Sequence, residues 1–250
     1  MNQVKYNKTQ LNPDTTFERH VFHRDQFAHY LRWTHVLKVA KIGMNVLDWG
    51  CGNGNLAEVL YRNRYKAKKY LGLDIRKKTI EIVKEKFKKV DWIDFKCKDL
   101  VEHLDIEKDI GNDWDMICCF EVLEHVGKEN AIKMIDNIAK ACNQDTMLLL
   151  STPVHDPKVG AAKNHIINGE IGEFGFEELK NILKKLFIVE DVFGTFASQK
   201  DYKSHMNEWQ KEMFLCLKKY YDTNLVSNLM APFFPKYSRN CLWRLKLKNE

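Results

Sequence analysis

Glycines alternate with other residues in one short stretch of the chain, where an apolar run ends and a helical pattern begins. The stretch reads DWGCGNG, residues 48–54. Glycine lets the backbone approach a ligand closely, and the first turn of a helix offers unpaired N–H groups. The acid Asp48 can accept hydrogen bonds from an ammonium group, whereas it cannot help to hold a pyrophosphate. Asn55 stands where the dinucleotide fingerprint G-x-G-x-x-G needs glycine, so the loop favours a nucleoside that carries an amino acid over NAD.

Two further aspartates follow the next two apolar runs. Asp74 closes YLGLD, about twenty residues beyond the glycines, where a carboxylate can accept both ribose hydroxyls. Asp99 follows the run after that and can meet the exocyclic amine of an adenine. Each aspartate alone also fits a turn or a helix cap. Together, in this order and register, the three favour a nucleoside site at the carboxyl ends of parallel strands.

The elements that must position these residues alternate along the chain. Short apolar runs predict strands at 45–49, 70–74, 92–97, 115–120, 147–151 and 188–193, with a last strand in 241–248. Helical spacing predicts helices at 24–39, 55–62, 77–87, 128–142 and 176–186, and a long amphipathic helix over 201–220. Such alternation is typical of βαβ units and a parallel sheet. The long glycine-containing loop over 152–172 is of a length that is usually functional.

Composition excludes several classes of protein. The chain has 250 residues, 44% of them hydrophobic, which fits one α/β domain. The net charge of +6 comes mostly from lysines, which indicates solubility before nucleic-acid recognition. No window approaches the roughly 18 apolar residues of a membrane span, and the polar first residues do not resemble a secretory signal. The seven cysteines form no CxxC pair, which indicates a reduced, cytoplasmic setting.

These motifs together resemble the class I S-adenosylmethionine-dependent methyltransferases. VLDWGCGNG, YLGLD, CKDL, FEVLEHV and LLLSTP resemble the five successive motifs of that family, over about residues 24–194 and the terminal strand. The resemblance implies a Rossmann-like α/β fold with a mostly parallel seven-stranded sheet, helices on both faces and an antiparallel last strand. One methyltransferase domain then spans 1–250. It comprises an N-terminal arm and lid helix (1–40), a cofactor-binding core (41–195), and a helical insertion with the terminal strand (196–250).

The resemblance also implies which residues bind S-adenosylmethionine. By the family pattern, Gly50 and Gly52 line the cofactor, and Phe120 contacts it from the end of the fourth strand. Arg32 matches the position of an arginine that binds the cofactor carboxylate in some relatives, although a solvated charge on a helix explains it equally well. The predicted cofactor-binding set is Arg32, Asp48, Gly50, Cys51, Gly52, Asp74, Ile75, Asp99, Leu100 and Phe120.

A second group of side chains that could bind a metal or take part in catalysis begins where the fourth predicted strand ends. If residues 121–125 are helical, Glu121, Glu124 and His125 share one face. Two carboxylates and an imidazole suit a divalent cation such as Mg²⁺ or Mn²⁺. The E-x-x-E-H pattern resembles small-RNA 2′-O-methyltransferases and ubiquinone-biosynthesis O-methyltransferases, which take a further downstream histidine. His165 is the predicted fourth ligand, with His155 as the alternative.

Other interpretations of this motif remain open. The same EVLEH sequence also occurs in relatives that use no metal, where it begins a helix and forms a cleft wall. Without a metal, His125 or His165 can act as a general base, a contribution of about 10²–10⁴-fold. The predicted catalytic residues are therefore Glu124, His125 and His165.

The methyl acceptor is predicted from absences. The sequence has neither the [DN]-P-P-[YF] loop of amino-methylating enzymes nor a Pro-Cys pair for cytosine C5, so an oxygen acceptor is favoured: a hydroxyl of a small molecule, nucleotide or sugar. Two alternatives are an RNA ribose 2′-O-methyltransferase, which acts on nucleic acid, and a catalytically silent cofactor-binding subunit. Tyr237, Arg239 and Asn240 are candidate acceptor contacts. The arm over 17–24 is a candidate lid.

Overall fold

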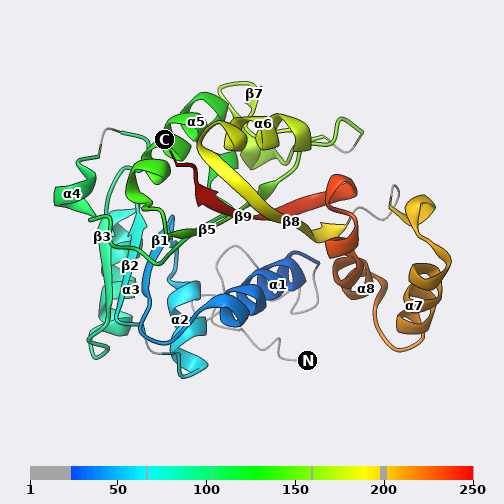
Figure 1. The fold of residues 1–250 in the computed structure, drawn as a ribbon, viewed down its shortest axis with the longest axis horizontal. Helices are drawn as coiled ribbons and strands as arrows, with labels where there is room; N and C mark the ends of the chain where they lie inside the picture. Colours follow the sequence, from blue (N-terminus) through cyan, green and yellow to red (C-terminus); the bar gives the residue numbers. More distant parts are fainter. Residues whose placement is uncertain (1–23, 66, 103, 159, 198–201, 250) are drawn as a thin grey trace, which may run out of the picture.

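Seven strands form one sheet in a computed structural model that describes residues 24–249, apart from 66, 103, 159 and 198–201. The candidate lid over 17–24 therefore lies almost wholly outside the described residues. The strand order is β3-β2-β1-β4-β5-β9-β8 (Figure 1). The strands are β1 (Asn45–Trp49), β2 (Lys69–Asp74), β3 (Ile93–Cys97), β4 (Met116–Phe120), β5 (Met147–Pro153), β8 (Phe187–Ala197) and β9 (Ser238–Leu247).

The direction of the strands places most functional loops at one edge. β1 to β5 are mutually parallel, and β9 runs antiparallel to both β5 and β8. Pro153 at the end of β5 pairs with Asn240 near the start of β9. The carboxyl ends of the parallel strands therefore share an edge with the beginning of the antiparallel one. The predicted mostly parallel sheet with an antiparallel last strand is confirmed.

Helices cover both faces of the sheet because strand side chains alternate between two cores. On one side, Leu47 and Trp49 pack with α5 (Lys128–Ala141) and α6 (Phe176–Leu186). On the other side, Val46 packs with α1 (Arg24–Val39), α2 (Asn55–Arg62) and α3 (Lys77–Phe87). A short helix, α4 (Ile106–Asp109), lies beside the first core. The five predicted helices before residue 190 are present with nearly the same bounds.

The helix predicted over 201–220 is wrong in extent. Within the described residues, a 3₁₀ turn (Lys203–His205) precedes α7 (Glu208–Lys218), and Asn207 caps that helix by accepting the Gln210 N–H at 2.9 Å. An unpredicted helix, α8 (Thr223–Met230), begins after Asp222, whose side chain accepts the Asn224 N–H. A small third core around Tyr202, Phe214 and Met230 joins these helices to the end of β8.

The long loop predicted over 152–172 contains a small hairpin. Its strands are β6 (Ile166–Ile167) and β7 (Glu170–Ile171). Asn168 and Gly169 link them with positive φ values of 52° and 84°, the conformation that an Asn-Gly pair favours in a two-residue hairpin. A regular hairpin therefore holds the side chains of this part of the loop.

No helix in the described part of the chain is both long enough and apolar enough to cross a membrane.

Candidate functional site

The glycine loop between β1 and α2 is held against the end of β2. The backbone N–H groups of Gly50 and Cys51 both donate to the carbonyl of Leu73, at 2.9 and 2.8 Å. Gly50 has a φ of 86°, and a Cβ there would clash with the side chain of Val122. A side chain is therefore excluded at Gly50 by both backbone conformation and space. The loop therefore packs directly against Val122 and β2 at the carboxyl edge of the sheet.

Two of the predicted cofactor acids flank this loop. Asp48 is buried and accepts a 2.6 Å hydrogen bond from the Tyr70 hydroxyl. Burial raises the pKa of Asp48 to about 7; the charge of Asp74 also raises it, and the hydrogen bond from Tyr70 lowers it in part. Asp74 accepts the Gly52 N–H at 3.0 Å and the Arg76 Nε at 3.1 Å. Such a glycine-rich loop, bordered by carboxylates, fits a nucleoside that carries an ammonium group.

The remaining predicted cofactor residues border the same edge. Asp99 is half-buried and accepts the Val101 N–H at 2.9 Å. Leu100 and Cys51 are buried, whereas Ile75 is 61% exposed. Phe120 ends β4, half-buried, in the core that is covered by α1 to α3. The structure thus brings these predicted residues to the ends of neighbouring strands.

Arg32 is buried in a polar network. It is 1% exposed, lies 2.7 Å from His29 Nδ1 and 3.4 Å from the Asn240 Oδ1, and forms an ion pair with Glu121 at 3.5 Å. Burial and the charge of Arg32 lower the pKa of His29 to about 3, so the ring accepts a hydrogen bond from the guanidinium. Arg32 is therefore not the solvated helix charge that was its alternative explanation.

Glu121 does not share a helical face with Glu124 and His125. Its φ is 57°, and only Leu123–His125 form a 3₁₀ turn, so the assumed helix over 121–125 is wrong. The Glu121 carboxylate accepts hydrogen bonds from Ser151 at 2.8 Å and Asn240 at 2.7 Å. With Arg32 as its ion-pair partner, Glu121 belongs to the Arg32 network.

Three predicted ligands do converge. One ligand atom each of Glu124, His125 and His165 lies within 4.8 Å of the other two. The His125 and His165 rings meet edge to face with centroids 5.0 Å apart. His125 Nε2 lies 3.8 Å from Glu124 Oε1. Glu121 and the alternative ligand His155 lie outside this group, which is the only such cluster among the residues described.

The donors of this cluster fit a divalent cation. Glu124 is 1% exposed and accepts a 3.0 Å hydrogen bond from the Thr152 hydroxyl. Burial, and next the charge of Glu121, raises the pKa of Glu124 well above its usual range. A buried carboxylate beside two imidazoles is stabilised by a positive ion. Ligand atoms about 2.1 Å from a metal lie about 3–4 Å apart, so the cluster needs to contract by about an ångström.

One residue of the candidate site was missed from the sequence. The carboxylate of Glu173 is fully buried and lies 2.6 Å from His165 Nδ1 and 2.8 Å from Arg239. Burial alone would raise the pKa of Glu173, but the His165 hydrogen bond and the Arg239 charge together lower it. Glu173 lies in GEFGF, where it resembles any other acid before a helix, so its spacing carries no signal.

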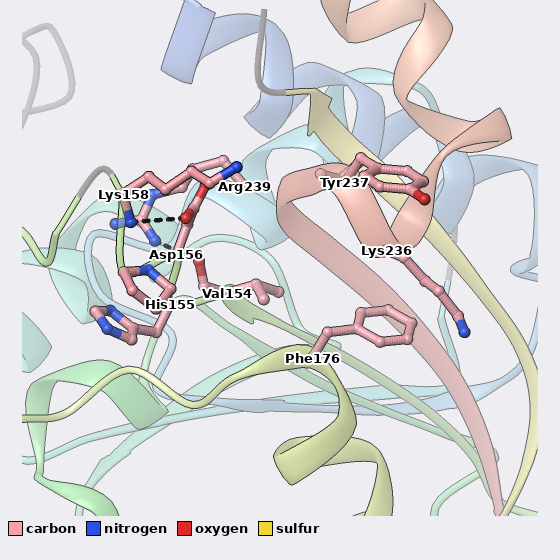
Figure 2. A pocket seen from close by; sticks show the side chains of 10 residues that line it. Val154, His155, Asp156, Lys158, Phe176, Lys236, Tyr237 and Arg239 are labelled. Carbon is pink, nitrogen blue, oxygen red and sulfur yellow. Dashed lines mark hydrogen bonds between the residues drawn. The ribbon is translucent and has the colours of Figure 1, made fainter. Parts of the chain in front are cut away.

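A pocket opens at the junction of β5, β9 and α6, and two of its lining residues, His155 and Arg239, are neighbours of Glu173. The volume of the pocket is about 220 Å³. Figure 2 shows Val154, His155 and Arg239 on one side, Lys236 and Tyr237 on the other, and Phe176 below. His205 stacks on Tyr237 with ring centroids 4.0 Å apart. Two candidate acceptor contacts, Tyr237 and Arg239, line the pocket; the third, Asn240, is buried in the Arg32 network instead.

Comparisons with known proteins agree with this geometry. The profile of a family described as a methyltransferase domain matches residues 19–210. The mitochondrial ubiquinone biosynthesis O-methyltransferase of Saccharomyces cerevisiae is 36% identical over 93 residues, which cover 36% of this chain and 27% of that protein. Its counterpart in Neisseria meningitidis serogroup A is 30% identical over 118 residues, covering 46% and 47%. The chain thus spans about half or less of these relatives.

A solved structure shares the fold over nearly the whole chain. It is the N-methyltransferase NodS from Bradyrhizobium japonicum WM9 in complex with S-adenosyl-L-homocysteine, with a TM-score of 0.55 and 16% identity. The match covers 94% of this chain and 91% of that one. At this identity, the likeness concerns the fold.

Proposed function

This chain belongs to the class I S-adenosylmethionine-dependent methyltransferases, and we propose that it methylates a hydroxyl oxygen of a small molecule, nucleotide or sugar. The observation that carries the proposal is the convergence of Glu124, His125 and His165, which Glu173 links to the pocket residues His155 and Arg239. The partial likeness to ubiquinone biosynthesis O-methyltransferases supports an oxygen acceptor.

We propose that the cofactor lies across the carboxyl ends of β1, β2 and β4. The bare backbone of Gly50 and Gly52 lines it, and Asp74 accepts the ribose hydroxyls in place of its contact with Arg76. Asp48 faces the ammonium group and Arg32 the carboxylate of the methionine part. Bound in this way, S-adenosylmethionine supplies an electrophilic methyl group. The remaining residues of the set are Cys51, Ile75, Asp99, Leu100 and Phe120.

Glu124, His125 and His165 are proposed to hold a divalent cation, Mg²⁺ or Mn²⁺. Such a cation would lower the pKa of the acceptor hydroxyl and orient it. The chain contributes the ligand geometry: Thr152 holds one oxygen of Glu124 by its 3.0 Å hydrogen bond, which leaves the other oxygen to face His125. Glu121 is omitted from the ligand set because Ser151, Asn240 and Arg32 occupy its carboxylate.

The pocket beside the cluster is proposed to bind the part of the acceptor that does not react. Phe176 and Tyr237 contribute aromatic rings to the lining, and Lys158, Lys236 and Arg239 contribute positive charge. A small polar molecule with an aromatic or planar part fits this lining.

An RNA ribose 2′-O-methyltransferase is the second candidate. The observation that favours it is the exposed stack of His205 on Tyr237 at the pocket, since an aromatic platform beside a lysine suits a nucleic-acid base. A cytoplasmic setting is proposed for either activity because all seven cysteines are unpaired and five of them are buried.

One experiment tests the function and separates the candidates. Purified protein receives methyl-labelled S-adenosylmethionine and a cell extract, which is then fractionated into metabolites, RNA, DNA, protein and glycans. We expect alkali-stable label in a small molecule, with no label from the Asp74→Ala variant. Label in RNA would favour the second candidate. Label in protein or on a nitrogen atom would contradict hydroxyl methylation.

A further inference from the structure

The carboxylate of Glu173 has no contact with the proposed cofactor residues, yet it is the most enclosed acid beside the cation cluster. Its side chain is fully buried. His165 Nδ1 lies 2.6 Å from one of its oxygens, and Arg239 contacts both, at 3.1 and 2.8 Å. His155 Nδ1 lies 3.9 Å away. A buried carboxylate needs such hydrogen-bond donors around it, and in return it fixes the orientation of the donors that it contacts.

The hydrogen bond to Glu173 decides which nitrogen of His165 carries the proton. A neutral imidazole that donates from Nδ1 has its lone pair on Nε2. Because Nδ1 is committed to the carboxylate, Nε2 is the nitrogen that His165 can offer to the cluster with Glu124 and His125. Carboxylates commonly orient metal-binding histidines in this way.

The backbone around Glu173 fixes the arrangement. The Gly172 N–H donates to the His165 carbonyl at 2.8 Å, so the hairpin holds His165 and Glu173 together. A Cβ at Gly172 would clash with the backbone carbonyl of Glu124. Only glycine therefore lets the hairpin pack this close to the turn that carries the other two ligands.

Arg239 ties the same carboxylate to the pocket. Its guanidinium also donates to the carbonyls of Val154 and Gly160, which fastens the loop after β5 to the start of β9. The positive charge balances Glu173, so that the acid can stay ionised while buried. Glu173 thus stands between the pocket wall and the cation cluster.

We propose that Glu173 is a positioning residue that holds His165 in the Nδ1–H tautomer, with Nε2 directed to a divalent cation; this rests on the cation of the proposed function. Glu173 touches neither cofactor nor acceptor and acts through His165. Removal of the Glu173 carboxylate should weaken cation binding. The affinity for S-adenosylmethionine should be kept, because the proposed cofactor residues lie on other elements.

The test measures Mn²⁺ binding to the full chain by electron paramagnetic resonance of the free ion, beside S-adenosylmethionine binding by calorimetry. Glu173→Gln should lose about 10–100-fold in Mn²⁺ affinity and keep cofactor affinity within about threefold. Glu170→Gln, an exposed acid of the same hairpin, is the matched control and should bind Mn²⁺ like wild type.

The outcomes separate this proposal from the proposed function. If wild type binds Mn²⁺ and Glu173→Gln binds it equally well, the positioning role is overturned and the cation stands. If wild type binds no Mn²⁺, the positioning role and the proposed cation are both overturned. Should Glu173→Gln fail to fold, ¹⁵N spectra of the wild-type imidazoles decide, with His165→Gln assigning the signal. Protonation of His165 at Nδ1 supports the proposal, and protonation at Nε2 overturns it.

Discussion

The two halves of the sheet edge are built in different ways. In the cofactor half, the proposed residues other than Arg32, which lies in α1, are at the end of the strand that positions them or shortly after, as in Gly50 after β1 and Asp74 at the end of β2. In the cation and pocket half, the contacts join distant segments: Arg239 and Glu173 are 66 residues apart, and Thr152 and Glu124 are 28 apart. Local spacing therefore defines the first half, and only the fold assembles the second.

This difference suggests that substitutions should separate the two halves functionally. A change in the glycine loop should remove cofactor affinity and leave Mn²⁺ bound. A change in the hairpin should do the reverse.

His165→Ala should reduce methyl transfer by about 10³-fold or more, because the cluster loses one of its three ligands. Mn²⁺ binding should fall with it, and S-adenosylmethionine affinity should stay within about threefold by calorimetry. His155→Gln is the matched control on the same loop and should keep Mn²⁺ bound. If His155→Gln abolishes Mn²⁺ binding and His165→Ala does not, the ligand assignment is reversed.

Gly50→Val should lower S-adenosylmethionine affinity by at least about 100-fold, since the side chain meets Val122 and the φ of 86° disfavours a β-branched residue. Calorimetry measures the loss. Gly43→Ala is the control: it has the same φ of 86° with no atom within 4 Å of an added Cβ. It should cost about 1 kcal/mol of stability and no cofactor affinity; an equal loss in both variants would mean that general destabilisation, not the loop, is measured.

Asp48→Asn should change how stability depends on pH. The folded pKa of Asp48 is raised from 3.8 to about 7 by burial, so the folded chain keeps a proton that the unfolded chain loses. The stability of the cofactor-free protein should therefore fall as pH rises from about 4 to 7, by up to about 4 kcal/mol. The Asp48→Asn variant should lack this pH dependence, because its amide does not titrate and its carbonyl oxygen can still accept the Tyr70 hydroxyl.

Melting temperatures of wild type and Asp48→Asn from pH 5 to 8 check this. The variant should gain on wild type as pH rises and bind S-adenosylmethionine about tenfold more weakly at pH 8, because a charge-assisted hydrogen bond to the ammonium group is lost. Parallel melting curves at every pH would contradict the buried-acid account of Asp48.

Tyr237→Ala should have the smallest effect, a rise of about tenfold in the KM for the acceptor with kcat within about threefold, because a stacking surface is worth about 1–3 kcal/mol. Steady-state kinetics with the acceptor found by labelling give both constants. Tyr220→Ala is the control, since Tyr220 is exposed and lies outside the pocket lining, and it should leave KM unchanged. A fall in kcat alone, with KM unchanged, would mean that Tyr237 does not contribute to binding of the acceptor.

The sequence predicted most of the fold because the apolar runs and helical faces are local. β1, α1, α3 and α6 have the predicted bounds. The errors lie where local signals compete: Asn207 begins α7 later than the amphipathic pattern suggested, and the Asn168-Gly169 turn makes a hairpin inside the predicted loop. Asn-Gly is a known turn signal, so the hairpin could have been predicted from the sequence.

The candidate site was predictable only in part, for a physical reason. The loop around Gly50 needs one strand, one turn and one helix start, which are contiguous in the chain. Glu121 was misplaced because its positive φ breaks the helical spacing that linked it to Glu124. Glu173 could not be found, since its partners His165 and Arg239 meet it only after the hairpin folds against β9.

The most direct test of the central claim, that Glu124, His125 and His165 hold a cation for methyl transfer, is transfer activity after chelation. Protein stripped with a chelator and assayed with labelled S-adenosylmethionine should lose activity, keep its cofactor affinity, and recover on addition of Mn²⁺ or Mg²⁺. Full activity in the stripped protein, with no change when either ion is added, would contradict the claim.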